Sequence, residues 1–536
     1  MTLLVIGVLL FLIVIGAPLF VIVGVATALC LTSFTEMSNF SDLQVLVQHM
    51  ENLATKQEFL AIPLFMASGA IMTAGGIARR LVELMRALLA GLPGGLAVAA
   101  VAACMVFAAI SGSSPVTLIA VGSMMFPALL DEGYPENFAI GLTTTAGSLG
   151  CLVPPSISML IYAISVSGSA GVDPSDLFLA GLLPALFISG LLAIYSIWVG
   201  RGLPRRTGFD YANLKQKFRE GAWALALPVL VLGGIYGGFY TPSQAGAVAV
   251  IYSLFVTIWV HQELTWKNAF RALYNSAELM GSLLPIIIFA FGLNEFLALV
   301  DVQEKLVAWV QALDPSPAGF LLLVNVVLIV LGALMDSISA TLIFAPLLAP
   351  MAQNLFGIDP VHFGVIFVVN MEIGYLAPPV ATNLFVASAI YRKPFGQVSK
   401  AVLPTLGITC FALAVIIYVP TISLGALNLR DDKPIYAAFP WEGRAVAAEE
   451  VEAPPPSGGG LKSISDKIGA GLEDEEAPPP SGGSSLKSLT GKIMDDLDEE
   501  DEAPPPPPTL KSLTGKIMDD LEDDEEGTGT ATKAAP

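Results

Sequence analysis

The stretch GCLVPP at residues 150–155 lies inside an apolar run and recurs as GYLAPP at residues 374–379. The two copies start 224 residues apart, because 374 minus 150 is 224. The triplet TLI has the same spacing, at residues 117–119 and 341–343. Chance rarely aligns two such blocks without a gap between them. The sequence therefore predicts two repeated halves.

The composition is that of a membrane protein. Hydrophobic residues make up 54% of the 536 residues, the mean hydropathy is +0.71, and only 13% of residues are charged. Soluble domains carry about 25% charged residues. A membrane-spanning helix needs about 20 mostly apolar residues, and apolar runs of this kind recur between residues 3 and 424. We therefore expect an all-α polytopic membrane protein.

The formal net charge of −20 belongs mainly to the C-terminal segment. Residues 431–536 hold 25 acidic and 9 basic residues, a net of −16, which leaves −4 for residues 1–430. Neither part offers the basic face that nucleic-acid binding requires, so no nucleic-acid partner is expected. The tail contains degenerate repeats that begin with LKS at residues 461, 486 and 510. Its Pro-rich, acidic composition predicts disorder. A solvated spacer and a short helix that folds onto a partner both remain open.

Lysine and arginine predict the orientation, because they favour cytoplasmic loops. They cluster near residues 79–86, 201–219, 267–271 and 392–400, whereas the loops at 36–51 and 301–304 are acidic. This distribution fits two halves that each cross the membrane five times and carry one re-entrant hairpin. Because five is odd, the halves are predicted to be inverted repeats, a common build of secondary transporters.

The predicted organisation follows from this topology. The N-terminus and the tail are expected outside, on the periplasmic side. The four predicted segments are a first inverted repeat at residues 1–200, a basic cytoplasmic linker at 201–220, a second inverted repeat at 221–425 and an acidic tail at 426–536.

Two polar hairpin tips and two broken helices form the candidate site. The tips are residues 111–117 and 336–341, and each faces an interrupted span, at 147–156 and 374–379. Consecutive prolines lack backbone N–H groups and free carbonyl oxygens, which at membrane depth must be buried or line a cavity. Such carbonyls and Ser/Thr hydroxyls suit a hard cation such as Na⁺. Helix N-termini at the same breaks suit a carboxylate.

Close helix packing is the alternative explanation for small and polar residues in membrane helices, but two matched motifs favour function. Acidic residues inside membrane segments are costly and usually functional. Asp336, in the second tip, is the stronger candidate. For Glu372, two residues before Gly374, an interfacial position is the alternative.

Five runs of sequence resemble one transporter family. They are AAISGSS at 108–114, GSLGCLVPPS at 147–156, GGIYGGFYTPSQAGAVAV at 233–250, MDSISATLIFAPLLAP at 335–350 and GYLAPPVATNLFVA at 374–387. Across about residues 1–425 the chain resembles the large membrane subunit of tripartite ATP-independent periplasmic (TRAP) transporters, of the DctM/SiaM type. The resemblance implies an elevator-type transporter of the bacterial inner membrane that is driven by a sodium gradient. Its implied cargo is an organic acid, a C4-dicarboxylate or a related carboxylate.

The resemblance also implies partners and site residues. The partners are a small four-helix membrane subunit and a periplasmic substrate-binding protein. The first sodium site, carried over from the family, comprises Ser111, Ser114, Gly150, Val153 and Pro155. The second, mapped by the internal repeat, comprises Asp336, Thr341, Gly374, Ala377 and Pro379. The residues expected to face the substrate are Ser113, Thr117, Ser156, Ser337, Ser339, Thr382 and Asn383.

Three other functions are weighed against this one. A sodium/dicarboxylate symporter that needs no binding protein would have the same arrangement of hairpins, and it stays the alternative. A channel predicts a continuous polar pore, whereas the sequence has two discrete polar breaks. An intramembrane enzyme needs a nucleophile with a base, or a metal set, and neither tip contains histidine or cysteine. No enzyme activity is therefore expected.

Overall fold

The computed structural model describes residues 19–34, 57–203, 210–379 and 381–440, together with residues 7, 8, 11, 12, 15 and 17. All of these belong to one compact unit, Met1–Val451. Most of the predicted first span, the acidic loop at 36–51 and the tail repeats after residue 440 lie outside the described residues. Within them, every regular element is helical, which agrees with the predicted all-α class.

The first half contains a hairpin followed by a broken span. Its elements are α2 (Leu19–Phe34), η2 (Gln57–Leu60), α4 (Ala61–Ala74), α5 (Ile77–Leu89), α6 (Gly95–Ser111), α7 (Ser114–Thr117), η3 (Leu118–Gly122), α8 (Ser123–Asp131), α9 (Glu136–Ser148), η4 (Leu149–Cys151), α10 (Ile157–Val166) and α11 (Pro174–Gly200). The hairpin runs up α6 and returns through α7, η3 and α8. The span breaks between η4 and α10.

The second half repeats this order. Its elements are α12 (Tyr211–Tyr236), α13 (Pro242–Phe255), η5 (Val256–Val260), α14 (Trp266–Leu299), α15 (Val302–Leu313), α16 (Pro317–Leu334), α17 (Ser337–Phe356), α18 (Pro360–Gly374), α19 (Thr382–Tyr391), α20 (Phe395–Tyr418) and α21 (Thr421–Arg430). Hairpin α16–α17 and broken span α18–α19 follow the first-half elements at about the 224-residue offset. The predicted segment boundary at 220/221 falls inside the continuous helix α12, and that at 425/426 falls inside α21.

Four helix starts, those of α11, α13, α16 and α18, follow one local rule. Asp173, Thr241, Ser316 and Asp359 are N-caps whose side chains accept backbone N–H groups of the first turn, and a proline follows each one. Proline suits the first helical position because its missing N–H would have no helical partner there. Each such cap contributes about 1 kcal/mol to helix stability. These starts are therefore encoded locally.

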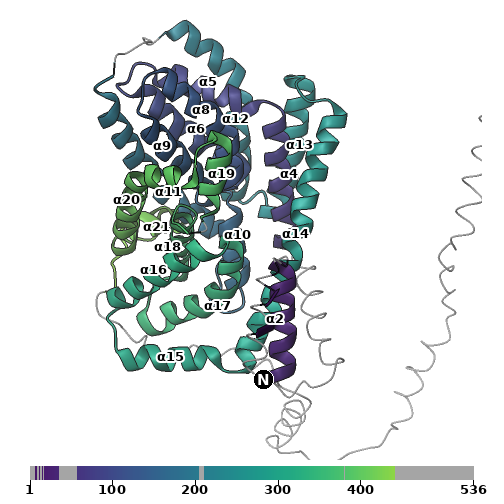
Figure 1. Ribbon diagram of the computed structural model, residues 1–536, viewed down its shortest axis with the longest axis vertical. Coiled ribbons are helices and arrows are strands. Elements are labelled where there is room, and N and C mark those ends of the chain that lie inside the picture. The colour runs from purple at the N-terminus through teal and green to yellow at the C-terminus, as the bar shows by residue number, and fades with distance from the viewer. Residues whose placement is uncertain are drawn as a thin grey trace, which may run out of the picture. The chain divides into compact units, whose positions relative to one another are not determined.

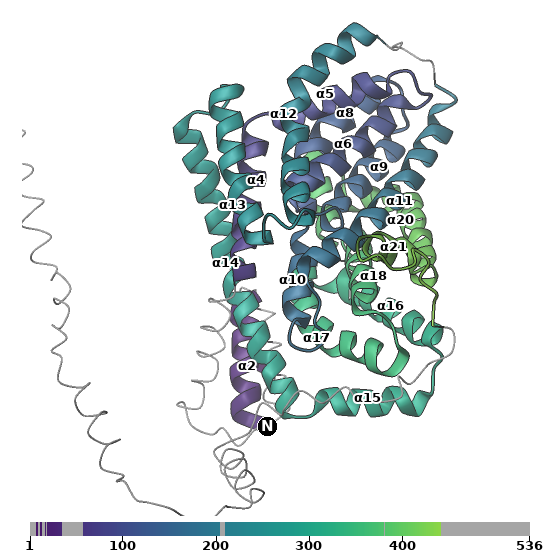
Figure 2. The ribbon, with the colours of Figure 1, turned by 180° about the vertical axis from the view of Figure 1, so that it is seen from behind.

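Helices α2, α4, α13 and α14 pack side by side as a column (Figures 1 and 2), and this column contacts the hairpins where α4 meets α6 and α14 meets α17. Gly246 of α13 lies against Leu64 of α4, and Ser68 of α4 donates to the Ala249 carbonyl at 3.2 Å. Helix α5 leads from the column to α6, and α15 leads from it to α16. We call these four helices the column below.

The broken spans lie in the core. Every residue of α10 is buried, as are Val361–Gly374 of α18. Among the described residues, eight helices are long and apolar enough to cross a membrane, or up to nine if Leu284–Leu299 and the bent segment Val302–Leu313 count as one span. The chain is thus a multi-pass membrane protein.

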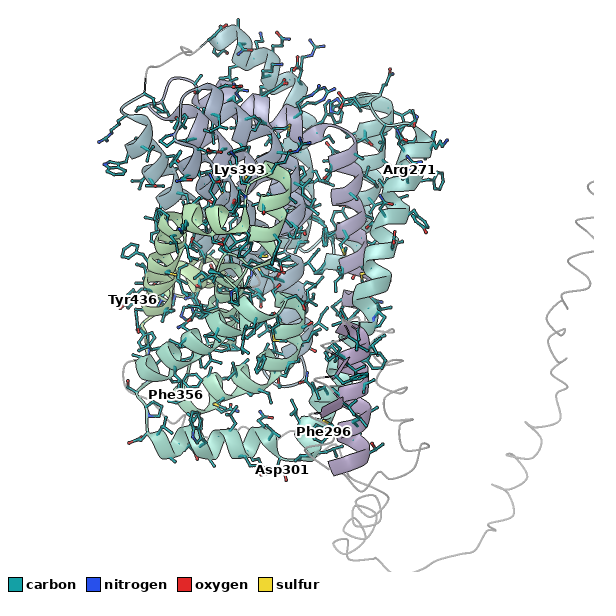
Figure 3. All side chains as sticks on the ribbon, in the orientation of Figure 1. Arg271, Phe296, Asp301, Phe356, Lys393 and Tyr436 are labelled. Carbon is teal, nitrogen blue, oxygen red and sulfur yellow. The ribbon has the colours of Figure 1, made fainter. Side chains whose placement is uncertain are left out.

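Four labelled residues show the two ends of the helices. Figure 3 shows Arg271 and Lys393 toward one end, and Asp301 and Phe356 toward the other. Phe356 ends the second hairpin. Lys393 forms an ion pair with Glu136, just after the first hairpin. The last residues of the two hairpins therefore lie toward opposite ends of the helices.

Candidate functional site

The first hairpin tip contacts the first broken span through backbone atoms. Gly112 has a φ of +60°, which favours glycine, and its carbonyl accepts the Ile157 N–H at 3.2 Å. A Cβ added to Gly150 would lie 2.5 Å from the Ser113 carbonyl oxygen. Only glycine at position 150 permits this approach of the break to the tip.

Hydroxyl groups gather within the first tip. The Ser111 and Thr117 hydroxyl oxygens lie 2.8 Å apart, and Thr117 donates to the Ser113 carbonyl at 2.9 Å. The Ser156 hydroxyl donates to the Cys151 carbonyl across the break. Except for Ser113, which is partly exposed, these hydroxyl side chains are buried. They form a compact group of oxygen atoms inside the protein.

The prolines of the first break leave carbonyl groups without helical donors. In an α-helix the N–H of residue i+4 bonds to the carbonyl of residue i. Pro154 cannot donate to Gly150, and Pro155 cannot donate to Cys151. The Ser156 hydroxyl takes the place of the missing donor at Cys151. The Gly150 carbonyl thus lacks its helical donor, and Val153 and Pro155 are buried at the same break.

The second tip has an acidic cap. Asp336 is the N-cap of α17, and its Oδ2 accepts the Ser339 N–H at 3.0 Å. Its Oδ1 is buried and has no hydrogen-bond partner among the described residues, and the same holds for the Ser339 hydroxyl. Thr341 donates to the Ser337 carbonyl at 2.6 Å. Asp336 therefore has a structural role as the cap of α17, while its Oδ1 and the Ser339 hydroxyl are left to interact with a ligand.

The second break meets its tip through Tyr375. The hydroxyl groups of Ser337 and Tyr375 lie 2.6 Å apart. A Cβ added to Gly374 would lie 2.6 Å from backbone carbons of Gly332 in α16, so this glycine packs against the hairpin limb instead of the tip. Ala377 is partly exposed and Pro379 is exposed, whereas Pro155 in the first break is buried. The two predicted sites are thus related but not equivalent.

The helix that follows each break packs against the hairpin of the other half. Helix α10 of the first half packs against α17, and α19 of the second half packs against α7 and η3. Asn383 on α19 consequently donates to the Ser114 hydroxyl at 2.5 Å, at the first tip. The repeat alone would assign Asn383 to the second site, and the structure places it at the first. Thr382 precedes it and is partly exposed.

A carboxyl group outside the predicted ligand sets occupies the centre. Glu372 is fully buried, and its Oε1 accepts the Ser148 hydroxyl at 2.8 Å. Its Oε2 has no partner among the described residues. Positions 148 and 372 are 224 residues apart, so equivalent positions of the two halves touch. The repeat spacing could have revealed this pair.

Comparisons with known proteins agree on one family. Residues 6–422 match the family model of the tripartite ATP-independent periplasmic transporter, DctM component. The C4-dicarboxylate TRAP transporter large permease protein DctM of Pseudomonas aeruginosa is 42% identical over 69% of this chain and 86% of its own length. The protein of the same name from Rhodobacter capsulatus is 38% identical over 80% of this chain and 99% of its own length.

A solved structure shares the fold at low sequence identity. The YdaH transporter of Alcanivorax borkumensis superposes with a TM-score of 0.52 and 15% identity, over 78% of this chain and 98% of that one. An identity this low bears on the fold alone. The matching family model and the two large-permease relatives carry the assignment: this chain belongs to the DctM component family of the tripartite ATP-independent periplasmic transporters.

Proposed function

We propose that this chain is the large transmembrane subunit of a sodium-coupled TRAP transporter that imports organic acids, with C4-dicarboxylates as the first substrates to test. The observation that supports this most strongly is the pair of hairpin tips, each in contact with a proline-broken helix in the core. Such discontinuous helices near the centre of an inverted repeat are where secondary transporters bind cargo and coupling ions. Both named relatives are C4-dicarboxylate permeases.

In this proposal Na⁺ is bound by oxygen atoms at each tip. The first site uses the hydroxyls of Ser111 and Ser114 and the backbone of Gly150, Val153 and Pro155. The second uses Asp336 and Thr341 with the backbone of Gly374, Ala377 and Pro379. The freed Gly150 carbonyl supports the first site, and the unpartnered Oδ1 of Asp336 supports the second. No arginine or lysine lies in either tip, so bound Na⁺ would supply positive charge for the carboxylate of the substrate.

The substrate would lie between the tips, within reach of Ser113, Thr117, Ser156, Ser337, Ser339, Thr382 and Asn383. The hairpin unit would carry it across the membrane by moving against the column, as in an elevator. Helices α5 and α15 support this part, because each joins the column to a hairpin. A small four-helix membrane subunit and a periplasmic binding protein are the proposed partners, in the bacterial inner membrane with the tail on the periplasmic side.

The test is uptake of radiolabelled succinate by proteoliposomes that contain this chain, its small subunit and its binding protein. At a clamped membrane potential, an inward Na⁺ gradient should drive uptake and an equal choline gradient should not. Ser114→Ala should raise the Na⁺ concentration needed for half-maximal uptake. Ser399→Ala, which removes a hydroxyl that bonds only within α20, serves as the control. Sodium-independent uptake would refute the coupling, and full uptake without the binding protein would favour the symporter alternative.

A further inference from the structure

A cavity of about 530 Å³, which is open to the surface and whose Asn268, Arg271 and Asn275 are exposed, lies between the column and the first hairpin. Its walls come from α4, from the returning limb of the hairpin and from the start of α14. The polar groups in these walls are Thr73, Glu263, Asn268, Arg271 and Asn275, and Ile119 closes the hairpin side. This volume is within the range typical of small-molecule sites.

Three polar side chains on α14 line the cavity at helical spacing. Asn268, Arg271 and Asn275 are separated by three and four residues, so they lie on one face of the helix. Small residues on both sides, including Ala74 and Ala272, leave the space open. The guanidinium group of Arg271 thus lies between the two amides, and all three side chains present hydrogen-bond donors on one surface.

The charge of this surface is positive. The Glu263 carboxylate in the cavity wall already accepts Arg80 at 2.7 Å and Arg79 at 3.2 Å. For Arg271, by contrast, no ion pair is found among the described residues. A guanidinium group binds carboxylates through two parallel hydrogen bonds. An anion with a carboxylate group is thus the ligand class that fits this wall.

The cavity also has a defined position along the transport path. Two of its lining residues belong to this path: Val116 lies within the first tip, and Ile119 follows the tip two residues later. Arg271 lies toward the same end of the helices as Lys393 (Figure 3), an end that the lysine and arginine distribution predicts to be cytoplasmic. A ligand that leaves the first tip toward this end would enter the cavity.

We propose that this cavity is a second, cytoplasmic carboxylate site, in which Arg271 with Asn268 and Asn275 receives the organic acid after its release from the first hairpin. The inference rests on the proposed transport function. It predicts that carboxylate on the cytoplasmic side occupies the cavity and slows further import. Arg271 is then a determinant of inhibition from that side and of the rate of release, without a part in sodium binding.

The experiment compares Arg271→Gln, Arg271→Lys and Lys267→Gln in proteoliposomes of one orientation. Lys267 is one helical turn before Arg271 and does not line the cavity, so Lys267→Gln is the matched control for loss of a positive charge. Succinate loaded inside the vesicles should inhibit uptake about ten times more weakly in Arg271→Gln than in wild type, the size expected for the loss of one hydrogen bond between charged groups. Lysine at 271 should restore part of the inhibition, and the Na⁺ dependence should be unchanged in all three variants.

A direct measurement separates this inference from the proposed function. Succinate binding to the purified chain, with Na⁺ absent, should weaken in Arg271→Gln and stay at the wild-type value in Lys267→Gln. Equal binding and equal inhibition in these two variants would overturn the cavity site even if wild-type transport is normal. If wild type transports nothing but Arg271-dependent binding persists, the proposed transport function fails while the anion site stands. A thermal unfolding curve verifies that Arg271→Gln is folded.

Discussion

Replacing Gly150 with alanine tests the contact between the first hairpin tip and the first broken helix. The added Cβ would lie 2.5 Å from the Ser113 carbonyl oxygen and 2.7 Å from the Ser114 nitrogen. Ordinary van der Waals contact begins at about 3.4 Å, so the tip backbone must retreat by 3.4 minus 2.5, or 0.9 Å. Such overpacking of a buried site typically costs about 1–3 kcal/mol.

The displacement falls on the peptide bond between Ser113, which is proposed to face the substrate, and Ser114, which is proposed to bind Na⁺. If about 1.4 kcal/mol of this cost is borne by the ion-bound state, the apparent Na⁺ affinity decreases about tenfold. Uptake measured over a series of Na⁺ concentrations should therefore shift to higher concentrations, while saturating Na⁺ recovers most of the rate.

Gly190→Ala is the matched control, because a Cβ at this position in α11 meets nothing within 4 Å. Thermal unfolding of both variants separates a local effect from general destabilisation. Wild-type Na⁺ dependence in Gly150→Ala would refute the reasoning, since it would mean that the tip and the break are not in contact during ion binding.

Three further predictions concern individual hydrogen bonds of the structure. Ser148→Ala should lower the free energy of unfolding by about 1–3 kcal/mol, because it leaves the buried Glu372 carboxyl without its partner at 2.8 Å; thermal unfolding measures this, and an effect no larger than that of Ser399→Ala would contradict it. Asn383→Ala should alter the Na⁺ or succinate concentration for half-maximal uptake, because its amide donates to Ser114 at the first tip, and unchanged uptake kinetics would remove α19 from that site. Thr241→Ala should cost about 1 kcal/mol of stability by removing a capping box with Gln244, whereas Thr241→Ser should stay close to wild type in the same unfolding measurement.

Local sequence was sufficient for the class of the protein and for the position of its breaks. Apolar runs demand helices in a bilayer, since unpaired backbone groups are too costly there. The consecutive prolines Pro154 and Pro155 interrupt their helix, because neither supplies a backbone N–H and both crowd the preceding turn. The 224-residue spacing then placed the second break at Pro378 and Pro379. These features depend on residues near one another in the chain, which makes them readable.

Contacts between the halves depend on packing that no local pattern encodes. The repeat would place Asn383 beside the second tip, but the exchange of α10 and α19 brings it to Ser114. Ser148 and Glu372 are ordinary residues of two separate helices until the halves meet and bury their hydrogen bond. The cavity beside Arg271 likewise exists only because α4, α14 and the first hairpin converge there. Helix breaks arise from backbone chemistry within a few residues. Which side chains share a site depends instead on how helices far apart in the chain pack together, and only the folded chain specifies that packing.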